Sequence, residues 1–170
     1  MKRNHWTAAL LSAAAAAGAA YFVAENRRVE SPEIPVPLPG LPGGMEGLRI
    51  AHLSDLHFPH CARPPRELAA LVRRLHPDLI VLTGDLIDRA DTFSPAVLAE
   101  TGRRLAAIAP CYAVPGNHEF RAGLVKEWTA LLTGAGVRVL GEEWVRLTRR
   151  GGSLWLGGLP YGRPIPPPGE

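Results

Sequence analysis

Three short polar clusters in this sequence each follow directly after a segment with the pattern of a β-strand. Alternating or continuous apolar residues mark these strand segments over 48–53, 78–83 and 111–114. The clusters that follow read S-D-L-H from Ser54, G-D-L-I-D-R from Gly84 and G-N-H-E from Gly116. Because open α/β sheets place their sites at the carboxyl ends of strands, this arrangement predicts one functional site at one edge of a sheet.

Segments with helical periodicity separate the predicted strands. Apolar residues recur at helical spacing over 66–75 and 124–132, and Ser94 followed by Pro95 marks the start of a third helix. Further strands are expected over 137–140, 144–148 and 153–157. This alternation predicts an α/β domain with a sheet packed against helices.

The first 28 residues differ in composition from the rest of the chain. Residues 6–24 carry no charge, and as a helix these 19 residues would span about 28 Å, close to the hydrocarbon thickness of a bilayer. We interpret residues 1–28 as a single-pass transmembrane anchor that holds the rest of the chain at the outer face of the cell membrane. A cleaved signal peptide is the alternative, since the alanine-rich run offers several small-residue cleavage sites.

A proline-rich stretch follows this segment. Residues 29–46 show neither a helical nor a strand period, and their prolines favour an extended polyproline conformation. We interpret the stretch as a stalk, with a ligand for a proline-binding module as the alternative. The globular domain is then expected over residues 47–170.

Charge and cysteine content argue against a nucleic-acid-binding protein and against a disulfide between the two cysteines. The chain has a net charge of +3, but its 17 arginines and 2 lysines are spread along the sequence among 16 acidic residues. This pattern indicates a solvated surface, so no nucleic-acid partner is predicted. Cys61 and Cys111 are expected at opposite edges of the sheet, too far apart for a disulfide.

The side chains of the three clusters suit a metal ion. In an extended chain Asp55 and His57 point the same way, so both can address one ion. The second cluster adds Asp85 and Asp88, and the third adds the amide oxygen of Asn117. Each cluster alone is compatible with an ordinary turn, but together they predict metal chemistry with oxygen and imidazole ligands, which Mn, Fe, Zn and Mg accept.

In this order the clusters resemble the D-x-H, G-D-x-x-D and G-N-H-[DE] motifs of the calcineurin-like metallophosphoesterase superfamily, over about residues 47–158. The resemblance implies a β-sandwich flanked by helices. It also implies hydrolysis of a phosphate monoester or diester by a water that two divalent metal ions activate. The anchor and stalk are similar to those of the bacterial envelope branch, which implies an envelope, lipid-linked or nucleotide-type substrate.

The resemblance also implies the metal ligands. Asp55 and His57 would bind one metal, Asp85 would bridge the two metals, and Asn117 would bind the second. The identity of the two ions stays open among Mn, Fe, Zn and Mg.

The same resemblance makes His118 the catalytic acid that protonates the leaving oxygen, with Asp88 holding its ring. Arg89 would hold a phosphate oxygen, and a solvated surface arginine is the alternative. We therefore expect the carboxylate of Asp88 within hydrogen-bond reach of His118.

One departure from the superfamily concerns the later histidine motifs. No histidine follows His118 in the sequence, so we expect residues 47–170 to be the N-terminal part of a metallophosphoesterase domain. His60 is the only plausible substitute ligand. A non-enzymatic remnant that acts as a membrane-tethered metal-binding or structural protein is the alternative function.

Overall fold

The first helix, α1 (Arg3–Asn26), is rich in alanine, the residue with the strongest helix propensity. The computed structural model describes residues 3–26, 31–61, 63–159 and 161–162, and α1 belongs to the first of two units, residues 1–36 and 37–170. The helix expected over residues 6–24 is therefore present. Within these described ranges no helix combines the length and the apolar character needed to span a membrane, so the transmembrane role is not confirmed.

The proline-rich stretch after α1 has no regular secondary structure over residues 31–38, and each of these residues is exposed. Its prolines remove backbone donors and fix the backbone dihedral φ, which disfavours both helix and sheet. The first helical turn after it is the 3₁₀ helix η1 (Gly43–Met45).

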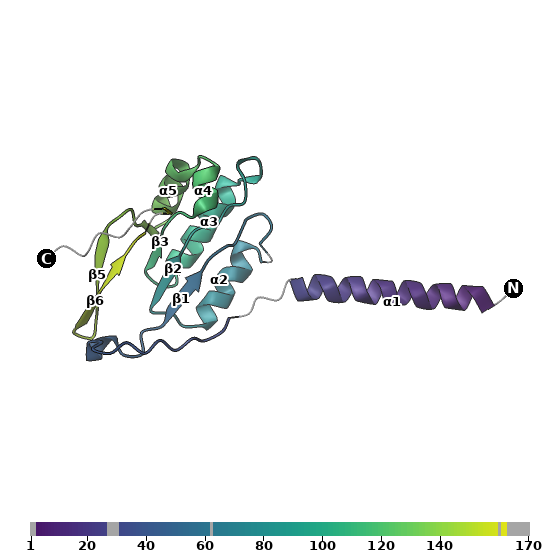
Figure 1. Ribbon diagram of the computed structural model, residues 1–170, viewed down its shortest axis with the longest axis horizontal. Coiled ribbons are helices and arrows are strands. Elements are labelled where there is room, and N and C mark those ends of the chain that lie inside the picture. Colours follow the sequence, from purple (N-terminus) through teal and green to yellow (C-terminus); the bar gives the residue numbers. More distant parts are fainter. Residues whose placement is uncertain (1–2, 27–30, 62, 160, 163–170) are drawn as a thin grey trace. The chain divides into compact units, whose positions relative to one another are not determined.

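A sheet of four parallel strands forms the centre of the second unit, in the order β1-β2-β3-β4 (Figure 1). Ala51 pairs with Ile80, and Ile80 with Cys111. The α/β class with a parallel sheet is thus confirmed. The strands are β1 (Ile50–Leu53), β2 (Leu79–Leu82), β3 (Cys111–Ala113) and β4 (Arg138–Val139).

Three helices supply the apolar side chains that cover one face of this sheet. The core joins buried strand residues such as Ile80 to Leu68 of α2, Leu105 of α3 and Trp128 of α5. The alternation of buried and exposed residues in β1 leaves Ile50 on the other face, 51% exposed. The helices are α2 (Pro65–Arg74), α3 (Pro95–Ala106) and α5 (Val125–Gly134), and Ser94 caps α3 by accepting a hydrogen bond from the backbone of Val97.

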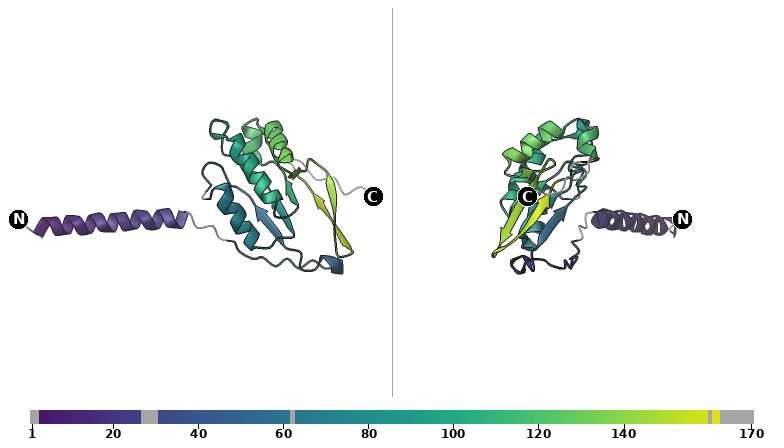
Figure 2. Two further views of the ribbon diagram at one scale, coloured as in Figure 1. Left: turned by 180° about the vertical axis from the view of Figure 1, so that it is seen from behind. Right: turned by 60° about the vertical axis from the view of Figure 1, so that its left-hand side comes forward.

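The last two strands form a separate antiparallel hairpin, β5 (Trp144–Arg149) and β6 (Gly152–Gly157). Figure 1 and the left-hand view of Figure 2 show this hairpin and α2 on opposite sides of the parallel sheet. Two sheets therefore form in the described part of the second unit, while a complete β-sandwich stays a prediction.

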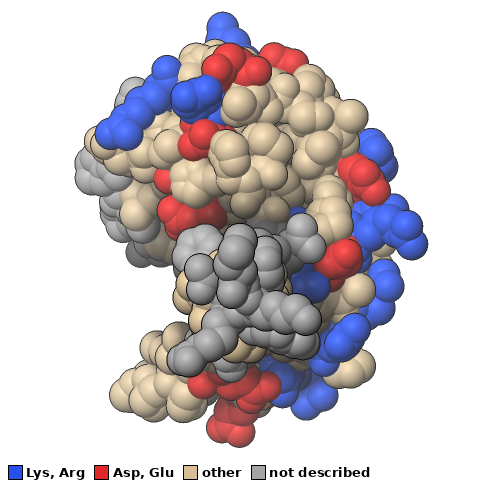
Figure 3. All heavy atoms as spheres, turned by 90° about the vertical axis from the view of Figure 1, so that its right-hand side faces the viewer, with Lys and Arg blue, Asp and Glu red and all other residues tan. Residues whose placement is uncertain are grey.

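Charged side chains at or just before the helices pair with residues four positions further along the chain. Arg63 and Glu67 lie 3.0 Å apart, and Glu100 and Arg104 lie 2.7 Å apart. Acidic side chains lie among the basic ones on the face that Figure 3 shows. Pairs this exposed contribute little to stability, so the fold depends on the apolar core instead.

Both cysteines are free thiols in different environments. Cys111 of β3 is 4% exposed, and this burial raises its pKa from 9.0 to about 12. Cys61 is only half-buried.

We predict that a maleimide at about pH 8 modifies one thiol in the folded protein and both in urea, because the protonated, buried Cys111 is a poor nucleophile. The folded state holds the Cys111 proton more tightly than the unfolded state. The stabilisation that comes from burying the protonated Cys111 thiol is therefore complete below pH 9.0 and is lost as the pH rises toward about 12. Mass spectrometry counts the labels, and a Cys61→Ser variant should lose the fast one. Two fast labels would contradict the buried position of Cys111.

Candidate metal centre

The first two polar clusters run side by side beyond the ends of β1 and β2. The backbone N–H of Asp55 donates to Gly84 O at 3.3 Å, and that of His57 donates to Asp85 O at 2.9 Å. These bonds extend the parallel pairing of the two strands into the loops. The clusters therefore meet at one sheet edge, as expected for strand ends in a parallel sheet.

Three of the site residues adopt a left-handed backbone conformation. The φ angles are 55° for Asp55, 44° for His57 and 52° for Asp85. Left-handed backbone is uncommon outside glycine, although aspartate and histidine tolerate it better than most residues. Surrounding contacts must hold such conformations, which cost about 1–3 kcal/mol each.

Two glycines let the second and third clusters approach each other closely. Gly84 has a φ of +92°, and a Cβ at this position would overlap the backbone of Gly116. A Cβ at Gly116 would in turn lie 2.7 Å from the backbone nitrogen of Asp85. Only residues without a side chain fit at this contact.

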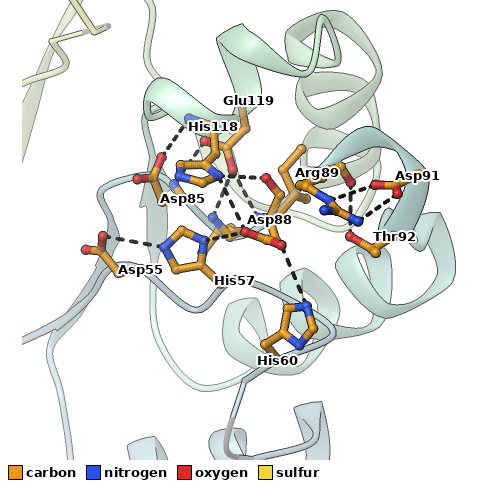
Figure 4. A network of polar contacts seen from close by, with 12 residues as sticks. Asp55, His57, His60, Asp85, Asp88, Arg89, Asp91, Thr92, His118 and Glu119 are labelled. Atoms are coloured by element: carbon orange, nitrogen blue, oxygen red, sulfur yellow. Dashed lines mark hydrogen bonds and ion pairs between the residues drawn. The ribbon is translucent and has the colours of Figure 1, made fainter.

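A short helix, α4 (Asn117–Arg121), starts directly at the third cluster. The backbone N–H of His118 in its first turn donates to Asp85 Oδ1 at 3.0 Å. The carboxylate of Asp85 is thereby oriented by the backbone of the neighbouring cluster. Figure 4 shows Asp85, His57 and His118 pointing toward one another.

His57, Asp85 and His118 each offer a ligand atom, and these atoms all lie within 4.8 Å of one another. The two imidazole rings meet edge to face, with centroids 4.5 Å apart. His57 Nδ1 is buried and forms no hydrogen bond among the described residues. A buried nitrogen without a hydrogen bond is costly unless another group, such as a metal ion, uses its lone pair or proton.

Asp55 and Asn117, the other two predicted ligands, border the same site. Asp55 Oδ1 lies 3.8 Å from His57 Nε2. Asp55, Asp85 and Asn117 all line one cavity of about 520 Å³. The structure thus places all four predicted ligands at one edge of the sheet.

Asp88 contacts His118 through its backbone. His118 Nδ1 donates to the carbonyl oxygen of Asp88 at 2.6 Å, while the Asp88 carboxylate is 3.8 Å from the same nitrogen. That carboxylate also lies 3.7 Å from His57 Nδ1 and 3.6 Å from His60 Nε2. The expected carboxylate–His118 hydrogen bond is therefore replaced by a backbone bond, because the carbonyl lies closer to the ring.

Two further residues from the sequence analysis lie elsewhere. The guanidinium of Arg89 forms two hydrogen bonds with Asp91, at 3.0 and 2.7 Å, and points toward Asp91 and Thr92 in Figure 4. His60 faces Asp88 and is not part of the His57–Asp85–His118 group. The role of Arg89 in holding a phosphate oxygen stays a prediction, and so does that of His60 as a substitute ligand.

Sequence reasoning missed Glu119, which is 0% exposed. Its carboxylate accepts hydrogen bonds from the backbone N–H groups of Asp85, Leu86, Ile87 and Gly116. The sequence did contain a signal for this role. Glu119 lies three positions after Gly116, the N-cap residue of α4, which is the spacing of a capping box.

Comparison with known proteins agrees with this arrangement. The family model of calcineurin-like phosphoesterases matches residues 48–162. The chain therefore belongs to the calcineurin-like phosphoesterase family.

Three curated relatives illustrate the match. A transmembrane protein with metallophosphoesterase domain from Bos taurus is 34% identical over 69% of this chain and 27% of its own length. The metallophosphoesterase YkuE of Bacillus subtilis is 29% identical over 85% of this chain and 53% of its own length. UDP-2,3-diacylglucosamine pyrophosphatase LpxG of Chlamydia trachomatis is 35% identical over 45% of this chain and 24% of its own length. The chain thus spans about a quarter to a half of the length of these relatives.

We predict that Gly84→Ala destabilises the protein, because alanine at a φ of +92° is strained and its Cβ would overlap Gly116. The strained backbone alone costs about 1–3 kcal/mol in the free energy of unfolding. Urea denaturation measures the loss. Gly141→Ala is the control, since a Cβ there meets nothing within 4 Å, and it should change stability by less than about 0.5 kcal/mol. Equal stabilities of the two variants would contradict the close contact.

Proposed function

We propose that this chain carries the metal site of a metal-dependent phosphoesterase. The observation that supports the proposal most strongly is the meeting of His57, Asp85 and His118 within 4.8 Å at the carboxyl ends of parallel strands. The family match supports the same reaction class.

The donor set suits the divalent ions that the sequence analysis named. Imidazole nitrogens and carboxylate oxygens together accept Mn, Fe, Zn or Mg. In the proposed assignment Asp55 and His57 would hold one ion, Asn117 would hold a second, and Asp85 would contribute its carboxylate to both. His57 Nε2 lies 3.8 Å from Asp55 Oδ1, which is consistent with one ion between these two residues.

When bound, the two ions supply polarisation of the phosphoryl group and activation of a water. The oxygen of that water would form a bond to phosphorus and give up its proton to solvent, while the bond from phosphorus to the leaving oxygen breaks. His118 gives a proton to the leaving oxygen. The Asp88 carbonyl accepts a hydrogen bond from His118 Nδ1–H. Nε2 is therefore the nitrogen that can carry the proton and release it to the leaving oxygen.

The proposed substrate is an envelope, lipid-linked or nucleotide-type phosphate ester. Tyr112, Leu140, Leu156 and Leu159 line the cavity beside Asp55 and Asp85, so an apolar substituent of the ester would be compatible with it. The name of the relative LpxG specifies a nucleotide-linked, diacylated sugar as that protein's substrate. Both observations favour the lipid-linked class.

Attachment of residues 1–28 to the cell membrane, with the rest of the chain at the outer face, stays a prediction. The bovine relative is named as a transmembrane protein, which supports membrane association. Recovery of the intact chain entirely in the soluble fraction after lysis would contradict it.

Manganese binding and hydrolysis of bis(p-nitrophenyl) phosphate by residues 1–170 test the proposal. Asp85→Asn should weaken Mn²⁺ binding at least tenfold, because it removes the bridging carboxylate. We expect low turnover even in the wild type, since the assigned residues fill only part of two coordination shells. Mn²⁺-dependent turnover should nevertheless exceed that of Asp85→Asn.

His118→Gln separates the two possible roles of His118. If His118 is the proton donor, Mn²⁺ binding stays within about twofold of wild type while turnover falls by about 10²–10⁴. Loss of binding equal to that of Asp85→Asn would make His118 a ligand instead. Equal Mn²⁺ binding by wild type and Asp85→Asn would overturn the proposed site. Binding without any turnover would favour the alternative function, a metal-binding or structural protein.

A further inference from the structure

Glu119 is a buried acidic side chain within the third cluster that neither the proposed ligand set nor the proposed reaction uses. It is 0% exposed and does not line the cavity beside Asp55, Asp85 and Asn117. Building on the proposed function, we propose that Glu119 is the positioning residue that sets the distance between the ligand-bearing loops of the metal centre.

The two oxygens of Glu119 have different partners. Oε2 accepts from the backbone of Asp85 at 2.9 Å and from Gly116 at 2.8 Å, so one atom joins the second cluster to the third. Oε1 accepts from Leu86 at 2.9 Å and from Ile87 at 3.3 Å. The carboxylate therefore fixes three consecutive backbone groups of one loop and one of the other.

A reciprocal hydrogen bond completes this connection. Glu119 of α4 holds the backbone of Asp85, and the Asp85 side chain accepts from the backbone of His118 in α4 at 3.0 Å. Asp85 also needs external support for its φ of 52°. The orientation of the proposed bridging carboxylate thus depends on Glu119, although Glu119 is not among the residues whose ligand atoms cluster.

The four backbone N–H donors require a carboxylate as their acceptor. Only an ionised carboxylate accepts hydrogen bonds at both oxygens, whereas a glutamine amide presents one acceptor and turns an N–H₂ group toward other donors. No lysine or arginine forms an ion pair with Glu119 among the described residues. Its charge is stabilised by backbone dipoles instead.

This geometry separates Glu119 from a catalytic or ligand role. The three residues whose ligand atoms cluster are His57, Asp85 and His118. Both Glu119 oxygens are already used by backbone donors and are shielded from solvent. We therefore expect Glu119 to act on metal affinity and geometry through Asp85.

Glu119→Gln tests this role by titration with Mn²⁺ and by the visible absorption of bound Co²⁺, both measured on residues 1–170. The Kd for Mn²⁺ should rise about 10–100-fold, the range for residues that orient metal ligands. The Co²⁺ bands should shift, because the ligand geometry changes. Glu119→Asp keeps the charge and both acceptors, so it should recover part of the affinity.

Two control variants separate positioning from general destabilisation. Glu127→Gln makes the same chemical change at an exposed position of α5, and Leu132→Ala removes a fully buried side chain from the core. Leu132→Ala should lower the Tm, and both controls should keep the wild-type Kd and Co²⁺ spectrum. If Leu132→Ala changed them as much as Glu119→Gln, the effect would be general destabilisation and the proposal would be wrong.

A further test uses only the wild-type protein, so it does not require that any variant folds. On addition of Zn²⁺, the amides of Asp85 and Gly116 should gain protection from hydrogen exchange together, because one Glu119 oxygen holds both. Protection of one loop without the other would overturn the proposal. A wild-type Kd in Glu119→Gln would also overturn it, provided that Asp85→Asn loses binding. Unchanged binding in both variants would instead contradict the proposed function itself.

Discussion

The carboxylate of Glu119, with four backbone N–H groups as donors, is the interaction on which the arrangement of this site depends. A buried carboxylate is unfavourable unless its acceptors are satisfied, so it constrains every loop that supplies a donor. Here those loops carry Asp85 and Asn117. The glycines at positions 84 and 116 remove the side chains that would keep the loops apart.

Much of the fold could be predicted from the sequence because burial imposes a strong pattern on it. The continuous apolar run over β2 favours a buried strand, and the helical spacing of apolar residues over α2 and α5 favours a helix. Each of these signals is local in the sequence. The position of the site followed from topology, since polar clusters after parallel strands must meet at one edge. Asp55, Asp85 and Asn117 were placed at one cavity in this way.

Details that depend on tertiary contacts could not be predicted. The left-handed φ angles of Asp55, His57 and Asp85 arise from pairing between distant loops, which no local signal encodes. The bond from His118 Nδ1 to Asp88 depends on the tertiary approach of the two loops, which puts the carbonyl oxygen at 2.6 Å and the carboxylate at 3.8 Å. The pairing of Arg89 with Asp91 similarly needs the turn of η2 (Ala90–Thr92).

X-ray absorption at the zinc edge of the zinc-loaded chain tests the central claim, that His57 and Asp85 share a metal ion, most directly. The account predicts nitrogen and oxygen ligands at about 2.0–2.1 Å, with the outer scattering of imidazole. His57→Ala should weaken the imidazole signal, and Asp85→Asn should lower the zinc content. A sulfur ligand at about 2.3 Å, as Cys61 would supply, or a spectrum without imidazole would contradict it.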